Sequence, residues 1–313
     1  MRSEFEFIES IKERHKLKVI GDDCAVVPMN AQSDQLFTVD LLIENIDFRL
    51  DWTTPALLGH KALAVSLSDI AAMGGTPTYA MLTLGIPQGL WKTSFLDEFY
   101  EGWHILADKF DVELIGGDIS RSPTDLIIDS FVIGEVPSGR AILRSGAKPG
   151  DLIFVTGELG AAALGLLLLE NGERLTNESI DPLQPSLLRQ LKPHPQLIIG
   201  NTLLQQELAS SNIDLSDGLS SDLAHLCKAS GVGAEIEASR LPIAKGASLE
   251  MALDGGEDFE LLFTVPPERR SAAAQLLCVE IGEITAETGK LTLLIDGELR
   301  PLAQQGYEHF KQA

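Results

Sequence analysis

The chain has 313 residues, and 46 Asp and Glu against 24 Lys and Arg give it a formal net charge of −22. This length predicts two domains with cores of their own, and 44% hydrophobic residues argue against a disordered chain. Nucleic acid and anionic membranes are excluded as partners, because both would be repelled and no basic stripe overrides the charge.

The N-terminal residues predict a helix followed by an acidic turn and a strand. Ser3 and Glu6 form a capping box, which is typical of a helix N-terminus. A turn of sequence Gly21-Asp22-Asp23 comes next. A strand is predicted over 36–43, and it contains Asp40.

The next helix is predicted to begin at Thr54 as N-cap, with Pro55 as its first residue, and to end at Gly74-Gly75. Asp69 lies on the same stripe as its apolar residues, where an unpaired acid would be costly. We therefore consider a site residue and a solvated residue equally good interpretations of Asp69. The remaining elements of this half are a strand over 79–86, a helix over 94–110, and strands at 114–115 and 126–136 around a Gly116-Gly117-Asp118 turn.

A domain boundary is predicted between 140 and 151, where glycines and prolines crowd a short basic stretch. It divides the chain into domains 1–140 and 141–313. On pattern alone, Arg144 and Lys148 are expected to be solvated linker residues. The second half is predicted to contain a strand at 152–156, an Ala/Leu-rich helix, helices at 195–210 and 220–230, and strands at 259–265, 279–284 and 291–295. Strands and helices alternate in both halves, which predicts layered α/β or α+β domains.

Several common catalytic motifs are absent from the sequence. It has no G-x-x-x-x-G-K-[ST] phosphate loop, no complete dinucleotide fingerprint, no G-x-S-x-G and no H-E-x-x-H. These absences leave zinc hydrolysis and serine-nucleophile chemistry with little support.

Features of secreted and membrane proteins are also missing. No apolar signal core is seen at the N-terminus, and the most apolar run, 159–169, is about half the ~20 residues that a membrane helix needs. The three Cys are far apart in sequence, which is unlike a disulfide framework. We therefore expect a cytoplasmic protein.

Carboxylates recur beside glycines or at the ends of apolar runs. Carboxylates that lie close together repel one another and destabilise the fold unless cations neutralise them. Their oxygen atoms are suitable ligands for Mg²⁺, which also binds substrate phosphates. Each acid taken singly is better explained as an ordinary turn residue than as a ligand. Taken together they predict magnesium-dependent phosphate chemistry. The acids are Asp22, Asp23, Asp40, Asp69, Asp118, Asp214, Asp217, Glu257 and Asp258.

The segments that carry these acids resemble the thiamine-monophosphate kinase family in order and spacing. Each block alone is shared with the wider superfamily of aminoimidazole ribonucleotide synthetase, whereas the full set is more specific. The matching segments are 21–25, 61–74, 115–118, 144–151, 213–219 and 255–261, and the match extends to Tyr307.

The resemblance implies an enzyme that transfers the γ-phosphoryl group of ATP directly, in line, to thiamine phosphate, giving thiamine diphosphate and ADP. It implies several Mg²⁺ ions. It also implies a homodimer, in which the N-terminal α/β domain pairs with its copy to form a β-barrel core. The C-terminal layered α/β domain would close over the active site.

The resemblance further implies roles for single residues. Asp23, Asp40, Asp69 and Arg144 would be catalytic. The metal positions are Asp23, Thr38, Val39, Asp40, Asp69, Asp118, Asp214 and Asp217. The ATP contacts are Gly117, Asp118, Arg144, Ser216 and Tyr100. The contacts to thiamine phosphate are Glu257 and Tyr307.

One position departs from the family pattern, because Asp47 stands where the family has a substrate-contacting His. A carboxylate cannot donate a hydrogen bond to the substrate phosphate unless it is protonated or bridged by a metal ion. Asp47 is therefore predicted to be a substrate residue that faces the cationic thiazolium, with no part in binding as the alternative. Two alternatives to the kinase therefore stay open. One is a synthetase-type enzyme of the same superfamily that also uses ATP, and the other is a non-catalytic protein that binds ATP and Mg²⁺.

Overall fold

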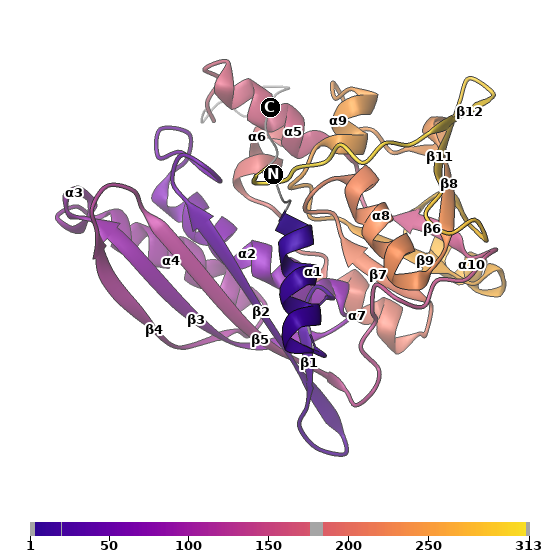
Figure 1. Ribbon diagram of the computed structural model, residues 1–313. Coiled ribbons are helices and arrows are strands. Elements are labelled where there is room, and N and C mark those ends of the chain that lie inside the picture. Colours follow the sequence, from indigo (N-terminus) through magenta and orange to yellow (C-terminus); the bar gives the residue numbers. More distant parts are fainter. Residues whose placement is uncertain (1–3, 20, 176–183, 311–313) are drawn as a thin grey trace.

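Two β-sheets, one from each half of the chain, organise the protein (Figure 1). The structure is a computed structural model that describes residues 4–19, 21–175 and 184–310. Both sheets are mixed, and helices pack against them, which confirms the mixed α/β class predicted from the sequence.

The first sheet has the strand order β1-β2-β5-β3-β4. Its strands are β1 (Ala25–Pro28), β2 (Ser33–Ile43), β3 (Thr76–Pro87), β4 (Glu113–Ser122) and β5 (Ile127–Pro137). Only β3 and β4 pair in parallel, and the other pairs are antiparallel. Within the described residues β1 and β4 are the free edges, so the sheet of a single chain is open and closes no barrel.

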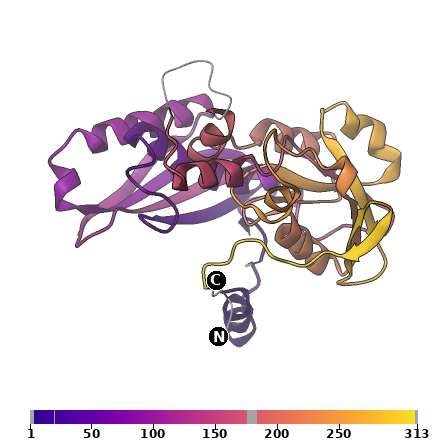
Figure 2. The same ribbon diagram turned by 90° about the horizontal axis from the view of Figure 1, so that it is seen from above.

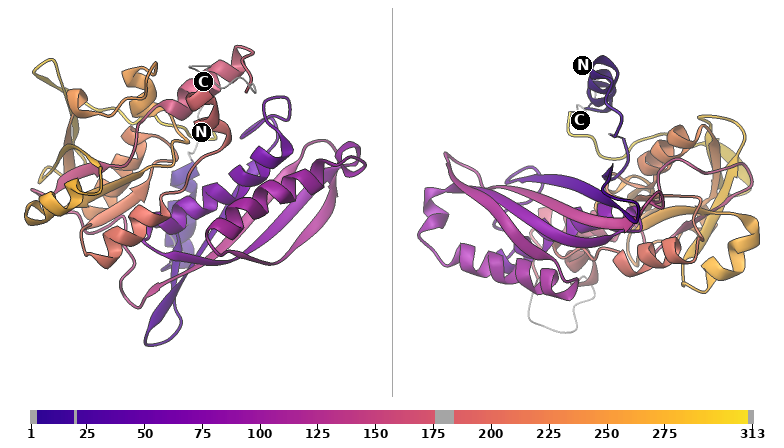
Figure 3. Two further views of the ribbon diagram at one scale, coloured as in Figure 1. Left: turned by 180° about the vertical axis from the view of Figure 1, so that it is seen from behind. Right: turned by 90° about the horizontal axis from the view of Figure 1, so that it is seen from below.

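Helices α2 (Pro55–Ala72) and α4 (Phe95–Lys109) cover one face of this sheet, as the rear view shows (Figure 3, left). The short helix α3 (Gln88–Trp91) precedes α4. Alternation along the strands explains the arrangement. On β2 the side chains of Leu36 and Leu42 are buried beneath the helices, whereas those of Val39 and Leu41 are exposed on the other face.

Helix α2 begins as predicted, since Thr54 is its N-cap and accepts a hydrogen bond from the backbone N–H of Leu57. Its burial differs from the prediction of one apolar stripe, because the helix is buried on nearly all sides. It contacts the first sheet and α4 on one side, and α6 (Gln184–Leu191), α7 (Leu197–Gln205) and β7 (Ser211–Asp214) on the other. It is thus the element that joins the two halves.

The predicted turn at Gly116-Gly117-Asp118 is wrong, because these residues lie inside strand β4. The irregularity that the glycines signal is a bulge in the pairing of β3 with β4, between Ala80 and Met81. Gly117 has φ +154°, and a Cβ atom there would lie 1.9 Å from the carbonyl oxygen of Leu82. Glycine is needed for close approach of two strands, which the sequence pattern did not distinguish from a turn.

The second sheet has the order β12-β11-β8-β10-β6-β9-β7, and only β8 and β11 pair in parallel. Its other strands are β6 (Leu152–Val155), β8 (Gly233–Glu237), β9 (Leu261–Val265), β10 (Val279–Thr285), β11 (Leu291–Ile295) and β12 (Glu298–Pro301). The helices of this half are α5 (Ala161–Glu170), α6, α7, α8 (Leu219–Ser230), α9 (Leu249–Asp254) and α10 (Arg270–Ala274). The predicted helix at 195–210 is therefore shorter than expected, and β7 replaces what was expected to be loop.

The predicted first helix is confirmed as α1 (Glu4–His15), although its predicted cap Ser3 lies outside the described residues. Seen from above, α1 stands apart from both sheets, on the side of the first sheet away from α2 and α4 (Figure 2). All three Cys are free. Among the described residues, no helix has the length and apolar character required to cross a membrane.

The main hydrophobic core crosses the boundary between the halves. Leu36 and Ile70 of the first half belong to the same buried cluster as Phe154 and Phe263, which stack in the second sheet. A second cluster lies within the C-terminal half alone and includes Ile236. The shared core holds α2 against both sheets, and this fixes the position of the acids described next.

Candidate active site

Three carboxylates from distant segments meet where the two halves join. They belong to Asp23 before β1, Asp69 in the last turn of α2 and Asp214 at the end of β7. One oxygen atom from each lies within 4.8 Å of the others. We call these three residues the carboxylate cluster.

Hydroxyl groups hold the acids in place. The Thr38 hydroxyl donates to Asp69, and the Ser68 hydroxyl donates to Asp214 at 2.6 Å. A third hydroxyl, that of Ser66, donates to Asp40 at 2.7 Å. Asp40 lies beside the cluster, and its charge acts on both Asp69 and Asp214. Four of the predicted metal-site acids and Thr38 are thus brought together.

Burial and crowding raise the pKa of Asp69, Asp214 and Asp40. Burial and the neighbouring Asp40 and Asp214 raise the pKa of Asp69 well above its ordinary value. Burial and Asp23 raise the pKa of Asp214 to about 8, against the hydrogen bond from Ser68. Burial also raises the pKa of Asp40, to about 6. Groups that resist ionisation next to like charges are typical of functional sites.

Arg144 faces the cluster and is not the solvated linker residue that its pattern predicted. Its guanidinium grips Asp23, with Nη2 2.8 Å from Oδ1 and Nε 3.2 Å from Oδ2. The side chain of Asp23 is fully buried. Asp22 accepts a hydrogen bond of 2.7 Å from the backbone N–H of Arg144, so the acidic turn and the Arg144 segment fix each other.

The donor set of the cluster fits a magnesium ion. All its ligand atoms are carboxylate oxygens, the atoms that Mg²⁺ prefers. Among the described residues, Arg144 is the basic residue that forms an ion pair with the cluster. The single positive charge of its guanidinium does not neutralise three or four carboxylates. Burial is the main cause of the raised pKa of Asp69 and Asp214, and a divalent cation would relieve the repulsion between carboxylates that adds to it.

A second group of polar side chains surrounds Glu257, which was predicted to contact thiamine phosphate. Lys61 of α2 forms an ion pair with Glu257 at 2.7 Å, and the side-chain amide of Gln190 in α6 donates to the other carboxylate oxygen. A small pocket next to them is lined by Lys61, Gln190, Asp47, Phe48 and Trp52. The predicted substrate residues Glu257 and Asp47 are therefore brought near each other, and the charge of Glu257 raises the pKa of Asp47, although less than burial does.

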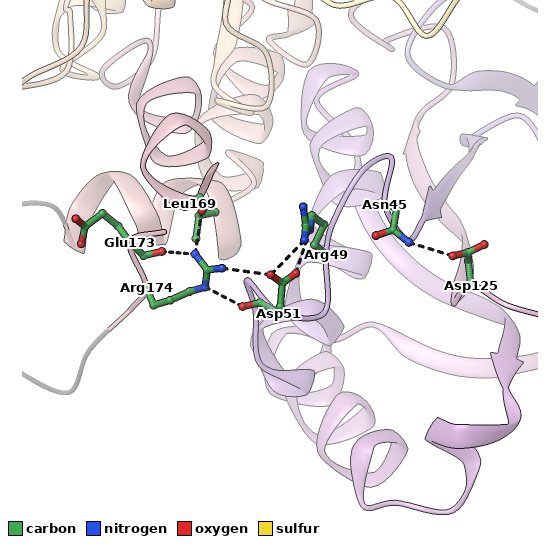
Figure 4. Close-up of polar contacts among 7 residues, drawn as sticks. All are labelled: Asn45, Arg49, Asp51, Asp125, Leu169, Glu173 and Arg174. Carbon is green, nitrogen blue, oxygen red and sulfur yellow. Dashed lines mark hydrogen bonds and ion pairs between the residues drawn. The ribbon is translucent and has the colours of Figure 1, made fainter. Parts of the chain in front are cut away.

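The loop that carries Asp47 is tied to the C-terminal half through Arg174 (Figure 4). Arg174 donates from Nε to the backbone oxygen of Asp51 at 2.8 Å and from Nη1 to that of Leu169 in α5 at 2.9 Å. Within the loop, Arg49 bonds to the Asp51 carboxylate at 3.0 Å. The carboxylate of Asp47 itself accepts a hydrogen bond from the backbone N–H of Ile43 at 2.8 Å. These contacts set the position of the pocket wall.

The C-terminal segment reaches the same region. The backbone N–H of Tyr307 donates to the carbonyl of Asp217 at 2.9 Å, and the Tyr307 hydroxyl lies 3.1 Å from Nδ1 of His309. The carbonyl of Ser216 accepts from the backbone N–H of Glu257 at 2.8 Å. The backbone of the Ser216-Asp217 segment thus bonds to both Glu257 and Tyr307.

Four predicted site residues do not join either group. Asp118 and Gly117 are exposed on β4, an edge strand that β5 and β3 separate from β2. The Val39 side chain is 59% exposed on the face away from α2. The Tyr100 ring packs between Phe99 and His104 within α4. Among the described residues of one chain, no hydrogen bond or ion pair links these four residues to the carboxylate cluster.

Several side chains that hold the site were not predicted from the sequence. Ser66 and Ser68 are fully buried in the interior of α2, and Lys61 is 3% exposed on the same helix. Polar residues at buried positions of an apolar helix must find partners, so this pattern was a usable signal. Gln190 had no such signal, because its helix α6 was not predicted.

The sequence is similar over most of its length to known proteins. Models of the AIR synthase related protein match it, the N-terminal domain at residues 21–136 and the C-terminal domain at residues 148–293. Thiamine-monophosphate kinase of Escherichia coli (strain K12) is 41% identical, over 93% of this chain and 91% of that protein. Thiamine-monophosphate kinase of Bacillus subtilis (strain 168) is 38% identical, over 98% and 99%.

Solved structures agree. One described as "AaThiL complexed with AMPPCP and TMP" has a TM-score of 0.88 at 34% identity and covers 98% of this chain and 97% of that one. A structure of the hydrogenase maturation protein HypE, at 18% identity and a TM-score of 0.71, shares the fold. The resemblance predicted from the sequence motifs is confirmed, and the chain belongs to the thiamine-monophosphate kinase family.

Proposed function

We propose that this protein transfers the γ-phosphoryl group of ATP to thiamine phosphate, giving thiamine diphosphate and ADP. The observation that carries the proposal is the carboxylate cluster, gripped by Arg144, in a chain of this family. The names of the relatives and the AMPPCP and TMP in the AaThiL structure agree with these substrates.

We propose that Asp23, Asp40, Asp69 and Asp214 hold Mg²⁺, with Thr38 beside them and Asp217 at a further ion. When bound there, Mg²⁺ supplies positive charge that neutralises the phosphates of the nucleotide. Burial and, after it, repulsion from neighbouring carboxylates raise the pKa of Asp69 and Asp214, and this supports the assignment because a cation would relieve the repulsion.

The roles of the other residues follow from their places. Arg144 keeps its charge at every relevant pH and lies against the cluster, so we assign it to the nucleotide phosphates together with Ser216. Glu257, Tyr307 and Asp47 would bind thiamine phosphate.

The acceptor is already a phosphate anion, so no side chain has to remove a proton from it. Phosphoryl transfer depends on positioning and charge, which favours direct in-line transfer without a phospho-enzyme.

We also propose a homodimer formed through the N-terminal domain, 1–140, with the C-terminal domain, 141–313, closing the site. The sheet face away from α2 and α4 exposes apolar side chains, among them Val39, Leu41 and Tyr79 at 59%, 54% and 41%. Apolar faces of this kind are typical of interfaces. Two such open sheets could together form the predicted β-barrel.

Asp118 lies on the same face of the sheet as these exposed apolar side chains. It pairs with Thr83, which is exposed between the buried Leu82 and Leu84, so both lie on the face away from α2. Asp40, by contrast, faces α2 and lies three strands away, about 14 Å at ordinary strand spacing. We infer that Asp118, with Gly117, serves the site of a second copy of this chain.

We also propose that the protein is located in the cytoplasm, because its three cysteines are free.

The decisive experiment is product formation from purified protein, ATP, Mg²⁺ and thiamine phosphate. Thiamine diphosphate and ADP in equal amounts are the expected result. ATP hydrolysis that responds to aminoimidazole precursors instead would favour a synthetase. Tight binding of ATP and Mg²⁺ without product from any acceptor would favour a non-catalytic protein. With a chiral γ-phosphorus, inversion is expected, and retention would indicate a covalent intermediate.

A further inference from the structure

Lys61 forms an ion pair with Glu257, and this is its one ionic partner within the described part of the chain. The ammonium group lies 2.7 Å from a carboxylate oxygen of Glu257 and also donates to the backbone oxygen of Gln190 at 3.3 Å. The Lys61 side chain is 4% exposed, whereas that of Glu257 is 30% exposed. The amine is therefore sealed in the protein, and the carboxylate still borders solvent.

Glu257 is held in an unusual backbone conformation. Its φ is +64°, a left-handed value that costs energy for a residue with a side chain. The preceding Gly256 lies so close to the Ser216 carbonyl that a Cβ atom would be 2.5 Å from it. The backbone N–H of Glu257 donates to that same carbonyl at 2.8 Å. The backbone thus points the carboxylate toward α2, and the side-chain contacts must hold it there.

These contacts come from both halves of the chain. Lys61 belongs to α2, and Gln190 belongs to α6. Both also line the small pocket that contains Asp47. A charged partner on one oxygen and an amide on the other leave the Glu257 carboxylate little freedom to rotate.

We propose that Lys61 is a positioning residue for substrate recognition, which fixes the carboxylate of Glu257 so that it can bind thiamine phosphate. The proposal rests on the proposed function for the identity of the ligand. It places no Lys61 contact on the substrate, because its amine is buried beneath Glu257 and Gln190.

The test measures binding by calorimetry, so that it does not depend on turnover. Lys61→Met is expected to weaken the binding of thiamine phosphate by about tenfold to a hundredfold, the range of a charged hydrogen bond. Binding of ATP with Mg²⁺ should be unchanged, because Lys61 does not touch the carboxylate cluster. In steady-state assays, the KM for thiamine phosphate should rise and the KM for ATP should not. Lys92→Met, at an exposed position, is the matched control.

A double-mutant cycle separates positioning from direct contact. If Lys61 acts through Glu257, the Lys61→Met change should have little further effect on a Glu257→Gln protein. Losses that multiply, or an unchanged affinity in Lys61→Met, would overturn the proposal. If Lys61→Met fails to fold, Gln190→Met removes the other contact to Glu257 and should weaken the same ligand. If the wild-type protein binds thiamine phosphate without turnover, the proposed kinase activity is wrong and the role of Lys61 can still hold. If it does not bind thiamine phosphate, both the kinase activity and the role of Lys61 are contradicted.

Discussion

The Ser68 hydroxyl donates a hydrogen bond of 2.6 Å to the carboxylate of Asp214. Ser68 comes from helix α2 of the N-terminal half, and Asp214 ends strand β7 of the C-terminal half. Both are buried. This bond therefore fixes one acid of the carboxylate cluster relative to another, Asp69, which follows Ser68 directly in the helix.

Loss of this bond should reduce activity without loss of the fold. In Ser68→Ala we expect kcat/KM to fall by about tenfold to a hundredfold and the Mg²⁺ requirement to rise, because an orienting partner of a metal ligand is removed. Steady-state rates measured over a range of Mg²⁺ concentrations check this. Ser211→Ala is the control, since Ser211 is equally buried on β7 and bonds Thr264 instead. Equal effects in the two variants would contradict the role of Ser68.

Asp69 is the acid on which the proposed site depends most. Asp69→Asn should lower kcat by several orders of magnitude, because a neutral amide is a poor ligand for Mg²⁺. The fold should survive, since the change removes charge repulsion and keeps the shape of the side chain. Circular dichroism and turnover are measured together, with the exposed Asp296→Asn as control. A near-normal rate in Asp69→Asn would remove this residue from the mechanism.

The raised pKa of Asp214 predicts how stability depends on pH in metal-free protein. Its pKa is about 8 in the folded state, against an ordinary value of 3.8, so the folded state binds the extra proton between these values. The free energy of unfolding contributed by this group is therefore present at low pH and is lost as the pH rises through 8.

In EDTA, the melting temperature should fall as the pH rises from 6 to 9, and Asp214→Asn should flatten that fall. Mg²⁺ competes with protons for the same oxygens, so the stabilisation by added Mg²⁺ should be larger at pH 8.5 than at pH 6. Thermal melts in EDTA and in Mg²⁺ measure both effects. An equal Mg²⁺ effect at the two pH values would argue against binding at this cluster.

Arg144 should be needed for nucleotide binding. Its two-point contact with Asp23 matches the planar guanidinium, so Arg144→Met and also Arg144→Lys should raise the KM for ATP by about tenfold or more. Arg140→Met is a fair comparison, because Arg140 lies in the same segment and pairs with exposed Glu207 at 2.8 Å. Normal kinetics in Arg144→Met would refute the assignment.

If Asp118 serves the site of a second chain, mixed dimers should recover activity. Asp69→Asn and Asp118→Asn proteins should each be nearly inactive. A mixture allowed to exchange subunits should regain about a quarter of wild-type activity, because half of the dimers are mixed and each has one intact site. Activity after mixing is compared with a mixture of Asp69→Asn and Asp214→Asn, which should stay inactive. No recovery in the first mixture, or a monomer by light scattering, would contradict the inference.

Much of the fold was predictable because its signals are local. The cap at Thr54, the glycines after α2 and the amphipathic pattern of α4 act within a few residues, and the structure confirms each element. The turn at Gly116-Gly117-Asp118 was wrong because a glycine that admits a neighbouring strand looks the same in sequence as one that turns the chain.

The sequence by itself determined the family and the kinds of groups available, since acids beside glycines keep their chemistry wherever the chain takes them. Only the tertiary structure decided which of them meet. It brought Asp23, Asp69 and Asp214 together, left Asp118 on a distant edge, and buried Lys61 against Glu257. The reason is that contact across the two halves depends on strand order and on the packing of α2 against both sheets, which no short stretch of sequence encodes.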